Sequence, residues 1–346
     1  MKTFFKIAAL IFFLAAAVAG VAAYFLFWAP AVPDHLQKNE FIIHRGMTVP
    51  QIADSLQQRG FIKSRERFIW ADKILKWRTM LKAGKYILEP GASNLALYKL
   101  FRSGKGVQQL VTLPEGKTVV DYAGILQRAL RIDSATVVRL AQDSAFVKQL
   151  NVPANNLEGY LYPNTYSFAW GVSGPEIIRT IVQQFHHQMN DSLRRRAAEL
   201  NMSVHQIVTL ASIIEGEAVV DSERAIIAAV YHNRLRQGIL LQADPTIQYM
   251  VPGPPRRLLN RDLVMDSPYN TYRYPGLPPG PVNNPGIASI RAALYPASVN
   301  YIYFVAAGDG SHIFSRTLEE HLRAKREFDK VRARVERASQ NSGRFR

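Results

Sequence analysis

The amino-acid sequence predicts an α+β fold that follows a single N-terminal membrane-spanning helix. Three observations support this prediction. No charged residue occurs between Lys6 and Asp34, a gap of 27 residues. Short strand-like runs alternate with amphipathic helical patterns in the first part of the chain, and longer helical patterns dominate after residue 150. Nine of the 19 prolines lie between residues 252 and 285, which indicates ordered loops rather than regular structure there.

The first thirty residues indicate where the protein resides. Roughly 20 apolar residues suffice to cross a bilayer as a helix, so residues 7–29 are long enough to do so. Lys2 and Lys6 precede the span, which predicts a cytoplasmic segment 1–6 and a body on the other side of the membrane. Tyr24 and Trp28 fit an interfacial aromatic belt. A cleaved signal peptide is the alternative, although the apolar run exceeds a typical signal core. We therefore expect a membrane-tethered protein with a single span and an extracytoplasmic body.

Composition restricts the partners and the chemistry. The net charge of +16 is typical of proteins that meet a polyanion such as nucleic acid or an acidic membrane surface. No nucleic-acid recognition motif accompanies the charge, so we expect no nucleic-acid partner. The basic tail, residues 336–346, is interpreted as a solvated helix end, with contact to anionic lipid as the alternative. The absence of cysteine excludes disulfides, thiolate nucleophiles and cysteine–zinc sites.

A strand, a glycine and a helix recur three times after a short linker at residues 30–39. Each copy of this motif places a hydroxyl residue where it can cap the helix that follows: Thr48, Ser93 and Thr118. Small αβ units that pack on one another are expected from this repetition. The pattern at residues 40–108 resembles the LysM-like module found next to cell-wall enzymes, and LysM modules bind N-acetylglucosamine polymers. A purely structural spacer is the alternative.

Residues 109–335 are expected to form a second, mainly helical domain. Ser203 and Gln206 form a capping box that opens an apolar helix. Glu215 and Glu217 lie on opposite shoulders of its apolar face, so helical geometry alone does not choose between them. A second amphipathic helix is predicted over residues 222–237, and residues 301–314 predict a hairpin with an Asp-Gly turn.

Because the motifs of other catalytic classes are absent from the sequence, acid–base catalysis by carboxyl groups is the remaining candidate. The eight histidines show no zinc-type pairing, and neither a Gly-x-Ser-x-Gly elbow nor a phosphate-binding glycine loop occurs, so we expect no metal and no cofactor. A glutamate beside apolar helix surface is desolvated, which favours the protonated form and suits general acid catalysis. Aromatic and amide residues nearby suit a sugar polymer. The alternative is that Glu215 makes only a structural hydrogen bond.

Five separated segments, in order along the chain, resemble the YceG-like endolytic murein transglycosylase family. They are "LEGYLYPNTY", "ASIIEGEA", "VYHNRLRQGILLQADPTIQY", "SPYNTYRYPGLPPGPVNNPG" and "YIYFVAAGDGSHIF". The resemblance as a whole covers roughly residues 110–335. Where the family usually has a charged or polar residue between its two acids, this chain has Gly216. The resemblance implies a lysozyme-like domain with Glu215 as catalytic residue. It implies supporting or substrate-binding roles for Glu217, Glu158, Gln242, Asp244, Thr246, Tyr249, Asn270, Thr271 and Tyr272.

The resemblance also implies the reaction. Peptidoglycan glycan strands would be cleaved between N-acetylmuramic acid and N-acetylglucosamine, with formation of a 1,6-anhydro ring. Nascent strands as substrate and penicillin-binding synthases as partners are implied in the same way. Asp244 as a second acid would instead indicate a muramidase-type hydrolase, with a turn-capping role as its structural alternative. A scaffold that binds glycan without cutting it is the non-enzymatic alternative.

Overall fold

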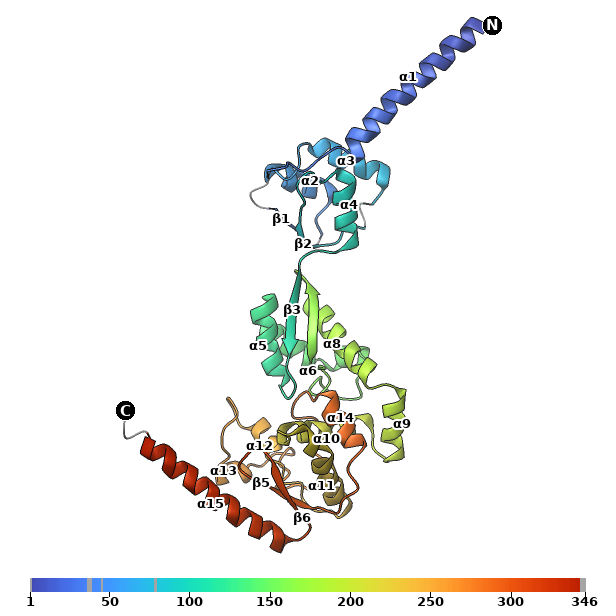
Figure 1. The fold of residues 1–346 in the computed structure, drawn as a ribbon. Helices are drawn as coiled ribbons and strands as arrows, with labels where there is room; N and C mark the ends of the chain where they lie inside the picture. The colour runs from blue at the N-terminus through green and yellow to red at the C-terminus, as the bar shows by residue number, and fades with distance from the viewer. Residues whose placement is uncertain (1, 36–38, 45, 78–79, 343–346) are drawn as a thin grey trace. The chain divides into compact units, whose positions relative to one another are not determined.

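The computed structural model describes residues 2–35, 39–44, 46–77 and 80–342, and its chain divides into two compact units (Figure 1). The first unit contains residues 1–110 together with 167–172, and the second contains residues 111–166 and 173–346. Helices and short strands are mixed in both units. The coarse α+β prediction is therefore confirmed.

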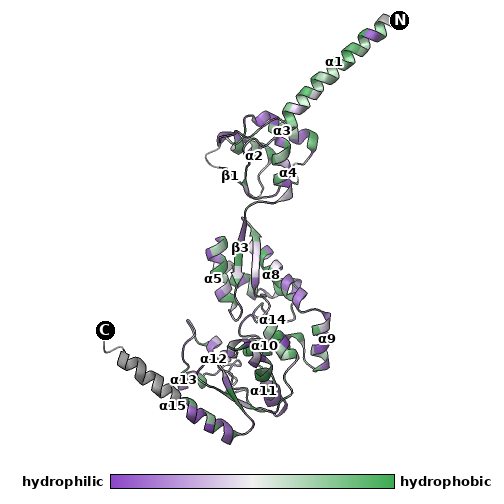
Figure 2. Ribbon diagram, viewed as in Figure 1, coloured by the Kyte–Doolittle hydropathy of each residue, from purple (hydrophilic) through white to green (hydrophobic). Residues whose placement is uncertain are grey.

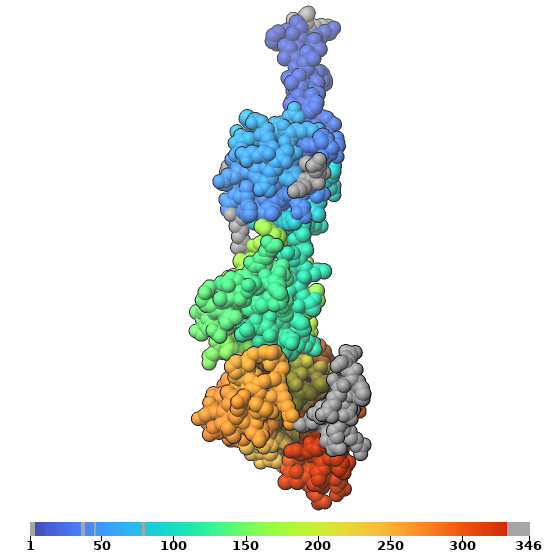
Figure 3. All heavy atoms as spheres, turned by 90° about the vertical axis from the view of Figure 1, so that its left-hand side faces the viewer, coloured from blue at the N-terminus to red at the C-terminus, as the bar shows by residue number. Residues whose placement is uncertain are grey.

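The N-terminal helix α1 (Lys2–Phe27) is long and apolar enough to cross a membrane over Phe4–Phe27. Figure 2 shows hydrophobic residues along nearly its whole length, and Figure 3 shows it standing clear of the rest of the first unit. Its side chains are mostly exposed, which an apolar helix in water would not tolerate. Such a helix fits a single-pass membrane anchor.

The rest of the first unit surrounds a small aromatic and aliphatic core. Strands β1 (Glu40–Ile43) and β2 (Gly84–Ile87) pair antiparallel, with Phe41 opposite Tyr86. Helices of this unit cover the pair. Val32, in the segment expected as a linker, is fully buried in this core. The remaining elements are α2 (Val49–Gln58), α3 (Arg65–Leu75) and α4 (Asn94–Ser103).

The three predicted helix caps are confirmed. Thr48, Ser93 and Thr118 each have extended backbone and accept a hydrogen bond from the amide three residues later. Each follows by two residues a glycine with positive φ (Gly46, Gly91 or Gly116), a conformation that other residues adopt at a cost. Two copies of this motif lie in the first unit, and the third lies near the start of the second unit.

The second unit is mainly helical, and α10 (Val204–Glu217) lies at its centre. The capping box at Ser203 is present, and every residue from Ile207 to Ile214 is buried. Because α10 packs against α9, α11, α12 and α14, its last turn is held on several sides. The neighbouring helices are α9 (Asp191–Glu199), α11 (Arg224–Arg236), α12 (Asp244–Met250) and α14 (Ile287–Leu294).

Shorter elements complete the second unit. The proline-dense segment contains little regular structure, as predicted. The hairpin prediction is confirmed, since β5 (Tyr303–Ala306) and β6 (His312–Ser315) pair antiparallel around the Asp-Gly turn. Strand β3 (Gln108–Leu113) pairs with β4 (Asn164–Ala169), and these two strands lead from one unit to the other. The other elements are α5 (Val119–Leu130), α6 (Ser134–Gln142), α7 (Ser144–Gln149), α8 (Gly174–Gln188), η1 (Asp221–Glu223), α13 (Asn260–Leu263) and α15 (Leu318–Ser342).

The tail predicted at residues 336–346 lies partly in α15, which reaches Ser342. Residues 343–346 lie outside the described residues, as does Met1 of the predicted cytoplasmic segment.

Candidate active site

A cavity of about 1330 Å³ lies within the second unit, at the C-terminal end of α10. Glu215, Gly216 and Glu217 form one wall, and the start of α5 and the loop before it form another. The start of α12 and the proline-rich loop 251–255 close a third side. A cavity of this size holds several sugar rings and carries carboxyl groups on its walls, so it is the natural candidate for a glycan site.

Glu215 lies in the last turn of α10 and has a nearly buried side chain. Its Oε2 accepts a hydrogen bond from the backbone amide of Gly286 at 3.1 Å, at the N-terminus of α14. The guanidinium of Arg224 lies 3.3 Å from the same oxygen. Both neighbours direct positive charge or a positive dipole end at this oxygen. The apolar surroundings predicted from the sequence are therefore only part of its environment.

Arg224 is itself fixed from three sides. Besides Glu215, its side chain donates to Asp221 Oδ1 at 3.0 Å and to Ser289 Oγ at 2.5 Å. The residue is nearly buried at the start of α11. Since residues of η1, α10 and α14 all contact it, the guanidinium has little freedom to leave Glu215.

Glu115 is a second carboxyl group beside Glu215, and the sequence analysis missed it. Burial, and then the negative charge of Glu215, raises the pKa of Glu115. A side chain on Gly286 would overlap the Glu115 carboxyl group, so this carboxyl packs directly on the Gly286 Cα. Gly286 thus contacts both acids, one through its amide and the other through its Cα. The hundred residues that separate the two glutamates explain why no local pattern revealed the pair.

Glu217 faces the same cavity two residues after Glu215 but has different neighbours. Burial raises the pKa of Glu217 to about 7, and the charge of Asp244 acts in the same direction. The Tyr231 hydroxyl donates to Glu217 Oε1 at 3.0 Å and opposes that rise. Glu217 can therefore exchange a proton near neutral pH, and it remains the second choice for catalysis.

Glu158 is almost completely buried and lines the same cavity. Its carboxyl group accepts from the Val119 amide at the N-terminus of α5, at 3.1 Å, and from Asn284 Nδ2 at 3.1 Å. Burial raises the pKa of Glu158 to about 8, although the Val119 amide opposes the rise. The position of Glu158 is that of a support between α5 and the loop that leads to Gly286.

Asn284 joins three segments around Glu215. Its Nδ2 donates to the Lys117 carbonyl as well as to Glu158, and its Oδ1 accepts from the Leu161 amide. Its backbone carbonyl accepts from the Gly116 amide at 2.9 Å. The side chain is fully buried, so these bonds are shielded from water. Asn284 therefore fixes the loop that carries Glu115 relative to the loop that carries Gly286.

The residues predicted between positions 242 and 272 divide into two groups. Asn270, Thr246 and Thr271 are buried, and they bond to the loop backbone or to one another. The amide of Gln242 donates to the Thr271 carbonyl. These four residues thus hold the loop 269–273 against the start of α12 and lie outside the cavity lining.

The second group reaches the cavity or its rim. Asp244 and Tyr249 line it, and the Tyr272 hydroxyl donates to Asp244 Oδ1 at 2.5 Å. No side-chain cap bond starts α12, whose N-cap is Ala243. The contacts of Asp244 therefore differ from the turn cap considered as its structural alternative.

The packing of α12 on α10 explains why a glycine occupies position 216, where this chain departs from the usual family pattern. A Cβ at this position would lie 2.6 Å from Pro245 Cβ and Cγ, closer than real atoms approach. The start of α12 therefore packs directly on the α10 backbone between the two acids. That close approach brings the Asp244 amide to the Glu217 carboxyl group.

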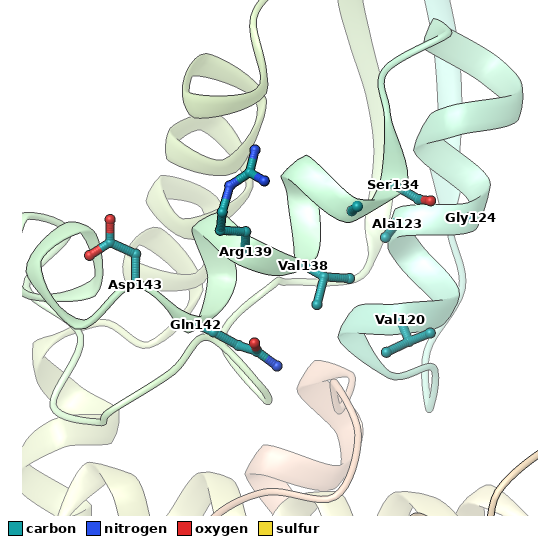
Figure 4. A pocket seen from close by; sticks show the side chains of 9 residues that line it. Val120, Ala123, Gly124, Ser134, Val138, Arg139, Gln142 and Asp143 are labelled. Atoms are coloured by element: carbon teal, nitrogen blue, oxygen red, sulfur yellow. The ribbon is translucent and has the colours of Figure 1, made fainter.

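A second hollow of about 920 Å³ lies over α5 and α6 (Figure 4). Val120, Val138 and Gln142 line both hollows, so the two adjoin. Within the described residues no group of three or more His, Asp or Glu side chains could hold a metal ion.

Comparison with known proteins gives concordant results. The model of the YceG-like family matches residues 41–327. An endolytic murein transglycosylase from Bacillus subtilis is 34% identical over 315 residues, which cover 86% of this chain and 87% of that protein. One of the same name from Streptococcus pneumoniae is 29% identical over 81% of this chain and 56% of its own length. The crystal structure of a YceG-like protein from Listeria monocytogenes has a TM-score of 0.59 and 34% identity, covering 83% of this chain and 99% of that one.

Proposed function

The chain belongs to the YceG-like family, and on that premise we propose that it is an endolytic lytic transglycosylase of peptidoglycan. The observation that carries the proposal is the position of Glu215. Its carboxyl group lies on the wall of a cavity large enough for a glycan, between the Gly286 amide and the Arg224 guanidinium. Glu215 is the proposed catalytic acid and base.

In the first step protonated Glu215 gives its proton to the glycosidic oxygen between N-acetylmuramic acid and N-acetylglucosamine. The bond from the anomeric carbon to that oxygen then breaks, and the leaving sugar takes the bonding electrons. Glu215 becomes a carboxylate, which the Gly286 amide and Arg224 stabilise. These two neighbours therefore lower the energy of the state that follows proton donation.

In the second step the Glu215 carboxylate removes the proton from the muramyl 6-hydroxyl. The oxygen of that hydroxyl attacks the anomeric carbon and closes the 1,6-anhydro ring. Glu215 regains its proton, so no water is consumed and no second carboxylate is needed as a nucleophile. Glu115 lies beside the reacting group, where burial and then the negative charge of Glu215 raise the pKa of Glu115.

The substrate path follows from the shape of the site. An endolytic enzyme cuts within a polymer, so the strand must continue beyond the scissile bond. The hollow over α5 and α6 adjoins the main cavity and offers that continuation. We assign it to the part of the strand that extends away from Glu215.

The location and the partners belong to the same proposal. Helix α1 would anchor the chain in the inner membrane with residues 1–6 in the cytoplasm and both units in the periplasm. The substrate would be the nascent, uncrosslinked strand, and penicillin-binding synthases would be its source. The LysM-like role of residues 40–108 also remains a proposal, and its ligand would be the same glycan.

Product analysis tests the reaction. Uncrosslinked strands are incubated with the purified full-length protein in detergent, and the new ends are identified by mass spectrometry. We expect 1,6-anhydro ends from the parent protein and from Glu66→Gln, a control at an exposed acid of the first unit. Glu215→Gln should lose activity by at least about a thousandfold, because one group performs both proton transfers.

Other products would change the assignment. Reducing ends would mean that water attacks, and Asp244 would then be the first candidate for a second acid. Full activity of Glu215→Gln together with an inactive Glu217→Gln would transfer the catalytic role to Glu217. Binding without any cleavage by the parent protein would favour the scaffold.

A further inference from the structure

Helix α3 carries an exposed apolar stripe that the proposed reaction does not use. Arg67, Trp70 and Ile74 are spaced by three and four residues, so they share one face of the helix. A neighbouring face is buried in the core of the first unit through Phe68 and Ala71. Trp70 is 56% exposed and Ile74 is 59% exposed, which is unusual for two large apolar side chains one turn apart.

The stripe begins at the end of the membrane-spanning helix. The Arg67 guanidinium lies over the Phe25 ring, 5.6 Å from its centre, and Phe25 is in the last turn of α1. Asn94 Nδ2 donates to the Leu26 carbonyl at 2.9 Å, and Leu26 and Phe27 pack against the core of the first unit. Because these contacts bind α1 to the unit, α3 lies beside the end of α1, where a span over Phe4–Phe27 would leave the hydrocarbon.

Charge and residue type fit that depth. The Lys73 ammonium lies 4.2 Å from the centre of the Trp70 ring, so a cation accompanies the exposed aromatic. Tryptophan is enriched where a membrane meets water, and lysine and arginine there extend toward the headgroups. Tyr24 and Trp28 are also exposed at the end of the span. The exposed aromatic and basic side chains at the end of α1 thus continue onto α3.

We propose that α3 lies on the outer surface of the membrane, with Trp70 and Ile74 among the lipid headgroups and with Arg67 and Lys73 against anionic phospholipid. The inference rests on the proposed anchor, to which it adds a second contact. A single span leaves a domain free to tilt, whereas a second contact on an adjacent helix fixes the orientation of the first unit at the membrane.

Site-directed spin labelling of the full-length chain tests the proposal. Because the chain has no cysteine, Ile74→Cys gives one nitroxide site without other changes. The matched control is Leu110→Cys in β3, an exposed apolar position of the same unit. Both proteins are reconstituted into phosphatidylcholine vesicles with and without phosphatidylglycerol. Collisions of each label with oxygen, which concentrates in lipid, are compared with collisions with a water-soluble nickel chelate.

We expect the ratio of oxygen to nickel collisions to be several-fold higher at position 74 than at position 110. The charge reversals Arg67→Glu and Lys73→Glu should reduce the ratio at position 74 by about twofold in vesicles with phosphatidylglycerol, and less without it. Equal ratios at both positions, in a protein that resists alkaline extraction, would overturn the contact of α3 and leave the anchor intact.

Two further outcomes would also contradict it. A label at position 74 that is shielded from both reagents would indicate protein contact on this face. Loss of the protein from the vesicles in the alkaline wash would refute the anchor itself. Neither result would affect the cleavage assay, which tests the reaction separately.

Discussion

Gly286 presents its amide to one carboxyl group and leaves room for another. Its N–H donates to Glu215, and its Cα supports Glu115 because no side chain intervenes. A backbone donor at this place cannot rotate away as a side-chain donor can. The geometry of the two acids therefore depends on the absence of a methyl group, and that dependence can be measured.

We expect Gly286→Ala to reduce kcat/KM by roughly ten- to a hundredfold, or about 1.4–2.7 kcal/mol, because the new Cβ displaces Glu115 and strains the amide contact to Glu215. In a Glu115→Ala background the methyl has space, so the same change should cost much less. Steady-state kinetics on the four proteins of this cycle measure the difference. An equal loss in both backgrounds would show that Glu115 does not mediate the effect.

Glu158 should make the stability of the second unit fall as pH rises. Its pKa is about 8 in the folded protein against an ordinary value of 4.5, so the folded state binds more protons between these pH values. Unfolding free energy therefore decreases with pH across that window, by up to about 1.4 kcal/mol per pH unit. Glu158→Gln should flatten this dependence and should be the more stable protein above pH 8.

Urea unfolding at several pH values between 4 and 9 measures this effect. Glu319→Gln, at an exposed acid in the first turn of α15, is the matched control and should keep the slope of the parent. Glu217, with a pKa of about 7, contributes in the same direction at lower pH, so the flattening should be incomplete. An unchanged slope in Glu158→Gln would mean that this carboxyl group is not buried as described.

At the scale of elements, the end of α10 is defined by what packs on it. The Pro245 ring rests on Gly216, the loop 282–286 bonds to Ser212, and α14 presents its N-terminus to Glu215. Each contact joins α10 to a segment that is distant in sequence. The position of the two acids in the cavity is therefore a property of the whole helical cluster.

The contact of Gly216 with Pro245 predicts the effect of restoring a typical family residue. Gly216→Lys should force α12 away from α10 and cost about 1–3 kcal/mol of stability. It should also reduce kcat/KM, because the Asp244 amide leaves Glu217. Pro245→Gly removes both clashing atoms and should partly restore the melting temperature of the lysine variant. Failure of this rescue would show that the clash is relieved elsewhere.

The hollow over α5 and α6 can be filled to test its assignment to the substrate. Ala135→Trp places a large side chain on its floor, whereas Gln149→Trp lies in α7 outside both hollows. If the strand extends over α6, the first variant should reduce kcat/KM for long strands by about tenfold, or roughly 1.4 kcal/mol, and short fragments should be affected less. Equal losses on long and short substrates would place the strand elsewhere.

Local signals and distant contacts were not equally predictable. The caps at Thr48, Ser93, Thr118 and Ser203 depend on residues within one helical turn, so the sequence revealed them. Helices α3, α6, α7, α12, α13 and α14 were not predicted, and neither was β4. Glu115, Arg224 and Asn284 escaped notice because the contacts that place them at the site join residues far apart in the sequence. Arg224 lies 9 residues from Glu215, Asn284 lies 167 from Lys117, and Glu115 lies 171 from Gly286.

At the scale of the whole molecule, the chain passes between the two units more than once. Residues 167–172 return to the first unit from the middle of the sequence, where Trp170 lies 5.9 Å from His44, ring centre to ring centre. The first unit is therefore built from two separate segments of the sequence and not from the N-terminal residues alone. The residues that line the cavity, by contrast, all belong to the second unit.

This division predicts the behaviour of a fragment that contains residues 106–346. The β3–β4 strands and the lining of the cavity remain in it, so the fragment should fold and cleave soluble strands with a kcat close to that of the full-length protein in detergent. Trp170 loses His44, and its fluorescence should shift toward that of a solvent-exposed indole. Cleavage and emission spectra measured on the same preparation check both expectations. A folded fragment that shows the expected shift of Trp170 emission but little activity would mean that the first unit takes part in catalysis, by binding the strand or by ordering the loops around Glu215.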